Sequence, residues 1–189
     1  MFSRKQQLID RTGKDGVGRY DFLRLLVVEF NTTKSQEAKE QVLANLANFA
    51  YDPVNYEYIR QLHIIDLFFA VITENNITLI RFAIGGICNL CLDPENKAYI
   101  IRNNGVASIL TLLSSSDEET VLSTITTLIF LITPASKSEI TSKNVIECMT
   151  RISESAGSTR LRNLATVFLN DYCKENELSE STEKAHIIT

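Results

Sequence analysis

The sequence predicts an all-α fold, a right-handed solenoid of about three and a half repeats with a period of 41 residues. One observation is that segment 45–55 nearly recurs as 86–96; in both, an apolar helix carries one Asn and is closed by Asp-Pro and Asn. Another is the low content of 7 Gly and 3 Pro, which favours helices over strands. The third is a series of residue types that cap helix N-termini, spaced 41 apart: Ser35, Asn76, Asp117 and Ser158.

The composition is that of a globular domain, with 44% hydrophobic and 22% charged residues. The net charge of -4 argues against binding nucleic acid or anionic membranes over the whole surface. Segment 120–136 is uncharged, but it holds five Thr and two Ser and is shorter than the roughly 20 residues of a membrane span. The first residues lead into no apolar signal region. We therefore expect no membrane partner.

The chain divides into three parts. Residues 1–18 are mildly basic and contain three Gly, which predicts a mobile tail. This tail is either a solvated terminus or an arm that orders on RNA or a partner. Residues 19–173 hold the repeats, and residues 174–189 are polar and acidic, which predicts a disordered tail.

All four cysteines are expected to be reduced core residues, because most repeat the small apolar positions of the helix seam. Cys88 and Cys91 form a C-x-x-C motif, but a zinc site needs about four ligands. The two His lie near no second Cys pair, and no βαβ pattern surrounds the motif. We therefore expect no metal and no other cofactor.

The first unit begins with the densely apolar stretch 20–30, which predicts a helix buried on most sides. Ser35 then caps a long helix, with Glu37 in the first turn, where the helix dipole favours an acid. Apolar residues recur along this helix at helical spacing, and the helix stops before Pro53, which cannot continue it.

Each later unit is expected to have a short, a middle and a long helix. In the second unit these are residues 55–61, 64–72 and 77–92. In the third, a short helix at 99–101 ends in a left-handed turn at Gly105, and a middle helix follows at 109–113. Ser116 and Glu119 are predicted to form a capping box ahead of the third long helix. The fourth, degraded unit has a middle helix at 145–152 and a long helix at 161–172.

The period of 41 residues lies in the range of HEAT and armadillo repeats. The turn at Gly105, the Asn on the long helix, and the pair Leu112 and Leu113 before a polar loop favour an armadillo-repeat solenoid. One such unit cannot bury both of its faces alone, so the stacking of units supplies the core.

Five segments are more specific than an armadillo consensus: AKEQVLANLANFAYDP at 38–53, NYEY at 55–58, FAIGGICNLC at 82–91, EETVLS at 118–123 and RLRNLA at 160–165. Together they closely resemble a family of armadillo-repeat proteins associated with the minor, U12-type spliceosome, and the resemblance covers residues 19–173. Members of that family pair with an RNA-recognition-motif protein near the capped end of a small nuclear RNA. The resemblance implies a nuclear, non-enzymatic splicing scaffold that reaches small nuclear RNA indirectly, through that partner.

In an armadillo stack the long helices line a concave groove, and an Asn repeated on them faces into it. A side-chain amide there can pair with both the N–H and the C=O of an extended peptide. The equivalents here are Asn48, Asn89, Phe130 and Asp171, or Asn170 if the last unit is shifted by one residue. Four residues earlier, importin-type grooves place a Trp that helps to grip lysine. This chain has small residues there, which argues against nuclear-import cargo: Ala44, Gly85, Thr126 and Val167.

One turn further back, Arg81 is predicted to face the groove, in a row with Glu40, Leu122 and Asn163. Gly85 and Gly86 flank it and are expected to leave the groove floor open. Each Gly costs about 1 kcal/mol against Ala in a helix interior. The compensation is either close helix packing or close approach of a partner backbone.

Two further groups complete the candidate site. Tyr56, Tyr58 and Arg60 form an amphipathic cluster of residue types enriched at interfaces, although Tyr58 also suits a packing role at the repeat edge. Arg162 belongs to a locally basic far end, where RNA contact is an alternative. The partner-binding candidates are therefore Asn48, Arg81, Gly85, Gly86, Asn89, Tyr56, Arg60 and Arg162.

Nothing in the sequence suggests catalysis or a small-molecule substrate, because it has no Gly-rich phosphate loop, no Ser/His/Asp set and no placed carboxylate pair. We expect a protein-binding scaffold of the minor spliceosome. One alternative is an armadillo adaptor that binds a peptide of another pathway in its concave groove. A direct RNA binder is a third hypothesis, which the acidic balance disfavours.

Overall fold

The computed structural model describes residues 2, 4, 6, 7, 10 and 16–173. The predicted acidic tail at 174–189 lies outside the described residues, as does much of the predicted tail at 1–18. The described part contains no strand, and none of its helices is long and apolar enough to cross a membrane. Its elements are α2 (Arg19–Thr32), α3 (Gln36–Phe49), η1 (Pro53–Asn55), α4 (Tyr56–Gln61), α5 (Ile64–Val71), α6 (Ile77–Leu90), α7 (Pro94–Arg102), α8 (Gly105–Leu110), η2 (Thr111–Ser114), α9 (Glu118–Leu131), α10 (Lys137–Ile140), α11 (Lys143–Ser155) and α12 (Thr159–Tyr172).

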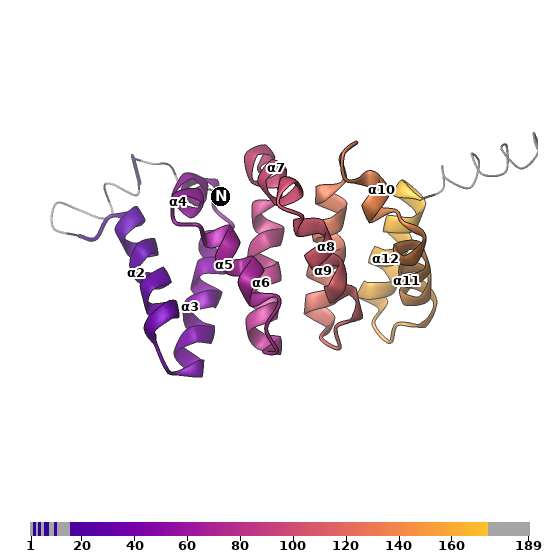
Figure 1. The fold of residues 1–189 in the computed structure, drawn as a ribbon, viewed down its shortest axis with the longest axis horizontal. Coiled ribbons are helices and arrows are strands. Elements are labelled where there is room, and N and C mark those ends of the chain that lie inside the picture. Colours follow the sequence, from indigo (N-terminus) through magenta and orange to yellow (C-terminus); the bar gives the residue numbers. More distant parts are fainter. Residues whose placement is uncertain (1, 3, 5, 8–9, 11–15, 174–189) are drawn as a thin grey trace, which may run out of the picture.

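The four long helices α3, α6, α9 and α12 stand side by side and form one layer of the stack (Figure 1). The middle helices α5, α8 and α11 form a second layer, and the short helices α4, α7 and α10 lie along one edge (Figure 1). Each long helix packs against the long helix of the next unit. This order of short, middle and long helices confirms the predicted all-α repeat solenoid.

The four predicted helix caps are confirmed. In each, the cap's side-chain oxygen accepts a hydrogen bond from the backbone N–H three residues later, at 2.9–3.4 Å. The predicted capping box of Ser116 and Glu119 is wrong, because Asp117 itself has the extended backbone and takes the N–H of Thr120. An ionised cap also suits the positive end of the helix dipole. The capping residues are Ser35, Asn76, Asp117 and Ser158.

The left-handed turn before the middle helix falls one residue earlier than predicted. Asn104 has φ 58°, and His63 in the preceding unit has φ 53°. Gly105 instead begins α8, where a Cβ would lie 2.7 Å from a ring carbon of Phe69 and 2.8 Å from the carbonyl oxygen of Ile100. The predicted turn at Gly105 is therefore wrong: this glycine allows close packing, and an asparagine, which tolerates the left-handed region, makes the turn.

Helix α2 is less buried than predicted. Leu23 and Phe30 are buried, but Phe22, Leu25 and Val28 are 40%, 49% and 46% exposed. The helix packs mainly against α3 and α4. The expectation of burial on most sides is wrong, because α2 stands at the end of the stack (Figure 1).

A continuous apolar core runs between the two helix layers. All four cysteines are free thiols, as predicted, but only Cys91 and Cys173 belong to the core, because Cys88 and Cys148 are partly exposed. Burial raises the pKa of the Cys91 thiol far above its usual range. Each unit contributes fully buried side chains to this core, among them Leu43, Ile59, Phe68, Ile84, Ile100, Ile125 and Phe168.

Candidate functional site

The candidate partner-binding surface is the long-helix face, formed by α3, α6, α9 and α12. Ala44, Gly85 and Thr126 are partly exposed on this face, and Val167 is 46% exposed. A Cβ placed on Gly85 would meet no atom of a neighbouring element within 4 Å. The backbone of α6 is therefore open to approach at this point, as the sequence predicts.

Gly86 points to the packed side of α6. It is buried, and a Cβ on it would lie 2.6 Å from two ring carbons of Phe68 in α5. Each of the two explanations therefore applies to one glycine: close helix packing explains Gly86, and open space for a partner backbone remains at Gly85. The prediction that Gly86 opens the groove floor is wrong, because successive helix residues point about 100° apart.

Arg81 joins two units. Its Nε donates to Oδ2 of Asp117 at 3.0 Å, and a terminal nitrogen donates to Oδ1, so both oxygens of the α9 cap are engaged. The bond from Arg81 holds the pKa of Asp117 below its usual range, and bonds from the amide and hydroxyl of Thr120 act in the same direction. The sequence did not indicate this link between α6 and α9, and a contact of Arg81 with a partner stays a prediction.

The residue equivalent to Arg81 in the first unit, Glu40, has a similar role. There Glu40 accepts a hydrogen bond from Nδ2 of Asn76, the cap of α6, at 3.3 Å. In the third unit the equivalent residue is the apolar Leu122, and the cap Ser158 instead donates to Glu118 at 2.6 Å. Glu40 and Arg81 therefore each bond to the cap of the next long helix.

The two predicted amides differ in their surroundings. Asn48 is exposed, and its side chain has no hydrogen bond to the rest of the described chain. Asn89 is half-buried, and its Nδ2 donates to the carbonyl oxygen of Ala47 in α3 at 3.1 Å. Asn48 is thus available to a partner, whereas part of the Asn89 amide already holds α6 to α3.

Tyr56 and Arg60 lie in α4, at the boundary between the second unit and the third unit, which contains α7. The Tyr56 side chain is buried and donates to the carbonyl oxygen of Asn89 at 3.2 Å, and burial raises its pKa. Arg60 forms ion pairs with Asp93 at 3.2 Å and Glu95 at 3.1 Å. The prediction that this amphipathic cluster meets a partner is wrong for Tyr56, because its ring is buried between units. The charge of Arg60 is neutralised within the chain.

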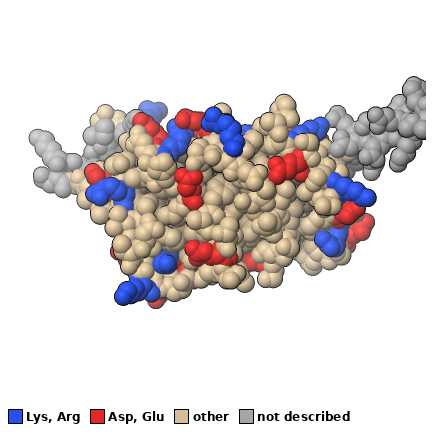
Figure 2. All heavy atoms as spheres, viewed as in Figure 1, with Lys and Arg blue, Asp and Glu red and all other residues tan. Residues whose placement is uncertain are grey.

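Arg162 closes the loop between α11 and α12. Its guanidinium donates to the carbonyl oxygen of Ala156 at 2.5 Å and to the hydroxyl of Thr159 at 2.9 Å. Figure 2 shows acidic and basic side chains interspersed on the viewed face, with no continuous basic patch. The predicted far-end cation therefore has a local structural role, and its contact with RNA or a partner stays a prediction.

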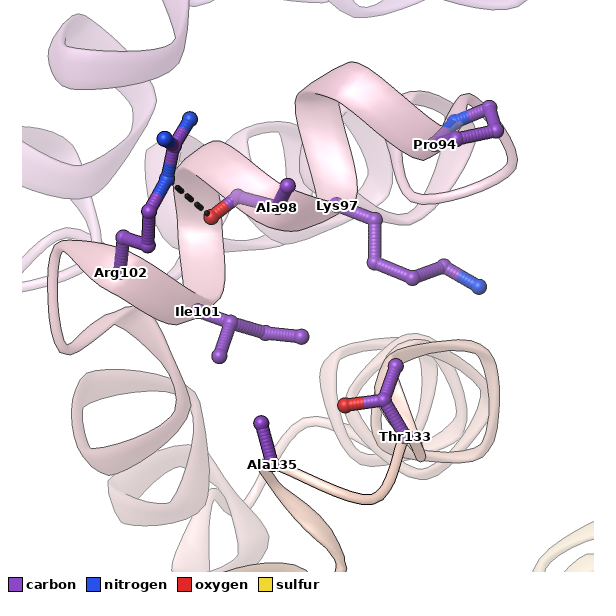
Figure 3. A pocket seen from close by; sticks show the side chains of 7 residues that line it. All are labelled: Pro94, Lys97, Ala98, Ile101, Arg102, Thr133 and Ala135. Atoms are coloured by element: carbon purple, nitrogen blue, oxygen red, sulfur yellow. Dashed lines mark hydrogen bonds between the residues drawn. The ribbon is translucent and has the colours of Figure 1, made fainter.

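The sequence did not indicate two pockets on the short-helix edge. The first lies between α4 and α7, with Arg60 and Asp93 among its lining residues. The second, of about 410 Å³, lies between α7 and the α9–α10 loop (Figure 3). Aligning the units at the 41-residue period would have brought the two sets of lining residues together. Neither holds a metal-ligand cluster, since the described residues contain no group of three or more such side chains.

Comparison with known proteins finds a close relative in sequence. Mouse (Mus musculus) armadillo repeat-containing protein 7 is 56% identical over 173 residues, which cover 90% of this chain and 87% of the relative. No protein-family model matches the chain.

Two solved structures are similar in fold. Computationally designed armadillo repeat proteins for modular peptide recognition match with a TM-score of 0.68 at 14% identity, over 80% of this chain and 63% of theirs. A designed armadillo repeat protein in complex with the peptide (KR)4 matches with a TM-score of 0.69 at 13% identity, over 82% of this chain and 70% of its own. This chain spans a little under two thirds of the first structure. At these identities the likeness shows the fold alone.

Proposed function

Because the chain belongs to the family of armadillo repeat-containing protein 7, we propose that it is a non-enzymatic protein-binding scaffold of the minor, U12-type spliceosome. In this role it works in the nucleus, pairs with an RNA-recognition-motif protein, and reaches small nuclear RNA through that partner. The observation that carries the proposal is the 56% identity over 90% of the chain, together with the spliceosomal association of the family it resembles.

We assign the partner segment to the long-helix face. The exposed amide of Asn48 and the open backbone at Gly85 support this assignment, because a partner chain can approach both without displacing packed side chains. A solved armadillo design holds a peptide, so the fold is suited to such binding. The small side chains at Ala44 and Gly85 give no aromatic slot for a lysine, and we therefore expect a partner segment that is not lysine-rich.

The proposal is tested by affinity purification from nuclear extract, with protein, RNA and fold all measured. The wild-type chain is compared with Gly85→Leu, which fills open space on the long-helix face. The matched control is Gly157→Leu, because a Cβ at Gly157 in the α11–α12 loop also meets no atom within 4 Å. Circular dichroism first establishes that all three proteins are folded.

We expect the wild type and Gly157→Leu to co-purify an RNA-recognition-motif protein and minor-class small nuclear RNA, and Gly85→Leu to lose both. Failure of the wild type to recover minor-class small nuclear RNA would contradict the spliceosomal role. Recovery of a partner from another pathway, lost in Gly85→Leu, would favour a peptide-binding adaptor. Equal recovery by all three proteins would leave the pathway intact and refute the assignment to this face.

A further inference from the structure

The two pockets on the short-helix edge are repeats of one another. Six of the seven residues that line the second pocket stand 41 positions after residues that line the first. Pro53 and Pro94, for example, occupy the same place in the two pockets, as do Arg60 and Ile101. The residues of the second pocket can therefore be compared, position by position, with those of the first.

In the first pocket the chain supplies its own acid. The cation Arg60 contacts the carboxylates of Asp93 at 3.2 Å and Glu95 at 3.1 Å, both from the next unit. An apolar side chain from a distant segment, Phe2, also borders this pocket, and its ring lies 5.6 Å from that of Tyr51. A cation, a carboxylate and an apolar side chain thus meet at this unit boundary.

The second pocket has cations at other positions of its wall, and it lacks the acid. The positions equivalent to Asp93 and Glu95 are Pro134 and Ser136, which carry no charge. Lys97 lies on the wall of this pocket, and Arg102 lies beside it with its Nε bonded to its own helix at the carbonyl oxygen of Ala98. Neither side chain has an ion pair in the described structure. Lys97 and Arg102 are therefore cations at the rim of the pocket without a counter-charge, and in Figure 3 the Arg102 guanidinium is turned toward Ala98, away from Thr133 and Ala135.

The wall between these cations is apolar. In Figure 3 the side chain of Ile101 points toward Ala135 and Thr133 across the pocket, and the methylenes of Lys97 extend along the same opening. The volume of about 410 Å³ is in the range of small ligand sites. Apolar walls favour a side chain over a phosphate group, so the occupant that fits is a protein segment.

We propose that this pocket, the α7 edge pocket, binds an acidic segment of a partner protein through one aliphatic side chain and flanking carboxylates. The aliphatic side chain lies against Ile101 and Ala135. The carboxylates pair with Lys97 and Arg102, in the way Asp93 and Glu95 pair with Arg60 in the preceding unit. This surface is separate from the long-helix face, so the chain can hold two segments at once.

The test uses the full chain and a fluorescent nine-residue peptide with one central leucine flanked by glutamates. Binding is measured by fluorescence polarisation. Lys97→Glu/Arg102→Glu reverses the two rim charges, and Ala135→Trp fills the pocket from an exposed position. The matched control Lys34→Glu/Arg151→Glu makes the same change in net charge at two exposed residues elsewhere.

We expect saturable binding that weakens about tenfold or more in each pocket variant, that weakens with added salt, and that is unchanged in the control. A peptide with serine in place of leucine, or lysine in place of glutamate, should bind at least about tenfold more weakly. Methyl resonances of Ile101 and Ala135 should shift on titration with the parent peptide.

Three results would overturn the proposal. One is no binding up to about 1 mM peptide, and another is equal binding by the pocket variants and the control. The third is tighter binding of a single-stranded RNA probe that is lost in Lys97→Glu/Arg102→Glu, because this would assign the cations to phosphate. The affinity purification described above tests the spliceosomal role and the long-helix face. Its outcome does not affect the peptide-binding measurement at the α7 edge pocket, so the two proposals can fail separately.

Discussion

The adjacent glycines of α6 should respond in opposite ways to substitution by alanine. Alanine is favoured over glycine in a helix interior by about 1 kcal/mol. At Gly85 the added methyl meets no neighbouring atom within 4 Å. Gly85→Ala is therefore expected to raise the free energy of unfolding by about 0.5–1 kcal/mol.

At Gly86 the same gain in helix propensity is opposed by a steric clash. The methyl would lie 2.6 Å from two ring carbons of Phe68, whose ring is rigid and 0% exposed. Relieving such overpacking costs about 1–3 kcal/mol. The propensity term cancels between the two variants, so Gly86→Ala should be less stable than Gly85→Ala by about 1–3 kcal/mol.

The assay is urea unfolding followed by far-UV circular dichroism, with the slope on denaturant required to stay constant. For a chain of this size, each kcal/mol should also shift the melting temperature by about 2–4 °C. Equal stability of the two variants, within about 0.5 kcal/mol, would refute the close approach of α6 to α5. It would also remove the structural basis for separating an open Gly85 from a packed Gly86.

Three more substitutions or modifications test other contacts. Asp117→Asn keeps a good cap but removes the charge that Arg81 contacts; because Arg81 is 42% exposed, we expect a cost of about 1 kcal/mol at neutral pH. The folded-state pKa of Asp117 is lowered, so the stability that its carboxylate contributes is present above the usual carboxyl range and is lost as pH falls. The difference in free energy of unfolding between wild type and Asp117→Asn, measured in urea, should therefore shrink toward roughly pH 3. A difference that stays constant with pH would count against the ion pair. His63→Asn should raise the free energy of unfolding by about 0.5 kcal/mol in thermal melts by easing the left-handed backbone, and a loss of stability would contradict this account. Native-state alkylation read by mass spectrometry should modify Cys91 at least about tenfold more slowly than Cys148, whereas equal rates would contradict the burial of Cys91.

Local features of this fold could be predicted from the sequence. The repeat, its period and its four long helices followed from apolar spacing and from the capping residues, such as Asn76 and Asp117. These signals are local: a cap bonds an amide three residues away, and an apolar stripe is set by the geometry of one helix. Local signals failed where two residues compete for one role, as Ser116 did with Asp117 and Gly105 with Asn104.

The contacts between units were decided only in the tertiary structure. Arg81 meets a carboxylate 36 residues away, and Arg60 meets one 33 residues away, and no local pattern distinguishes such partners from solvent-exposed charges. The same holds for Gly85 and Gly86, because the place where α5 packs decides which of the two is buried. By itself the sequence determined the repeated unit and its family resemblance. The stacking of units decided which faces are open, because the positions of neighbouring helices set the burial and pairing of each side chain.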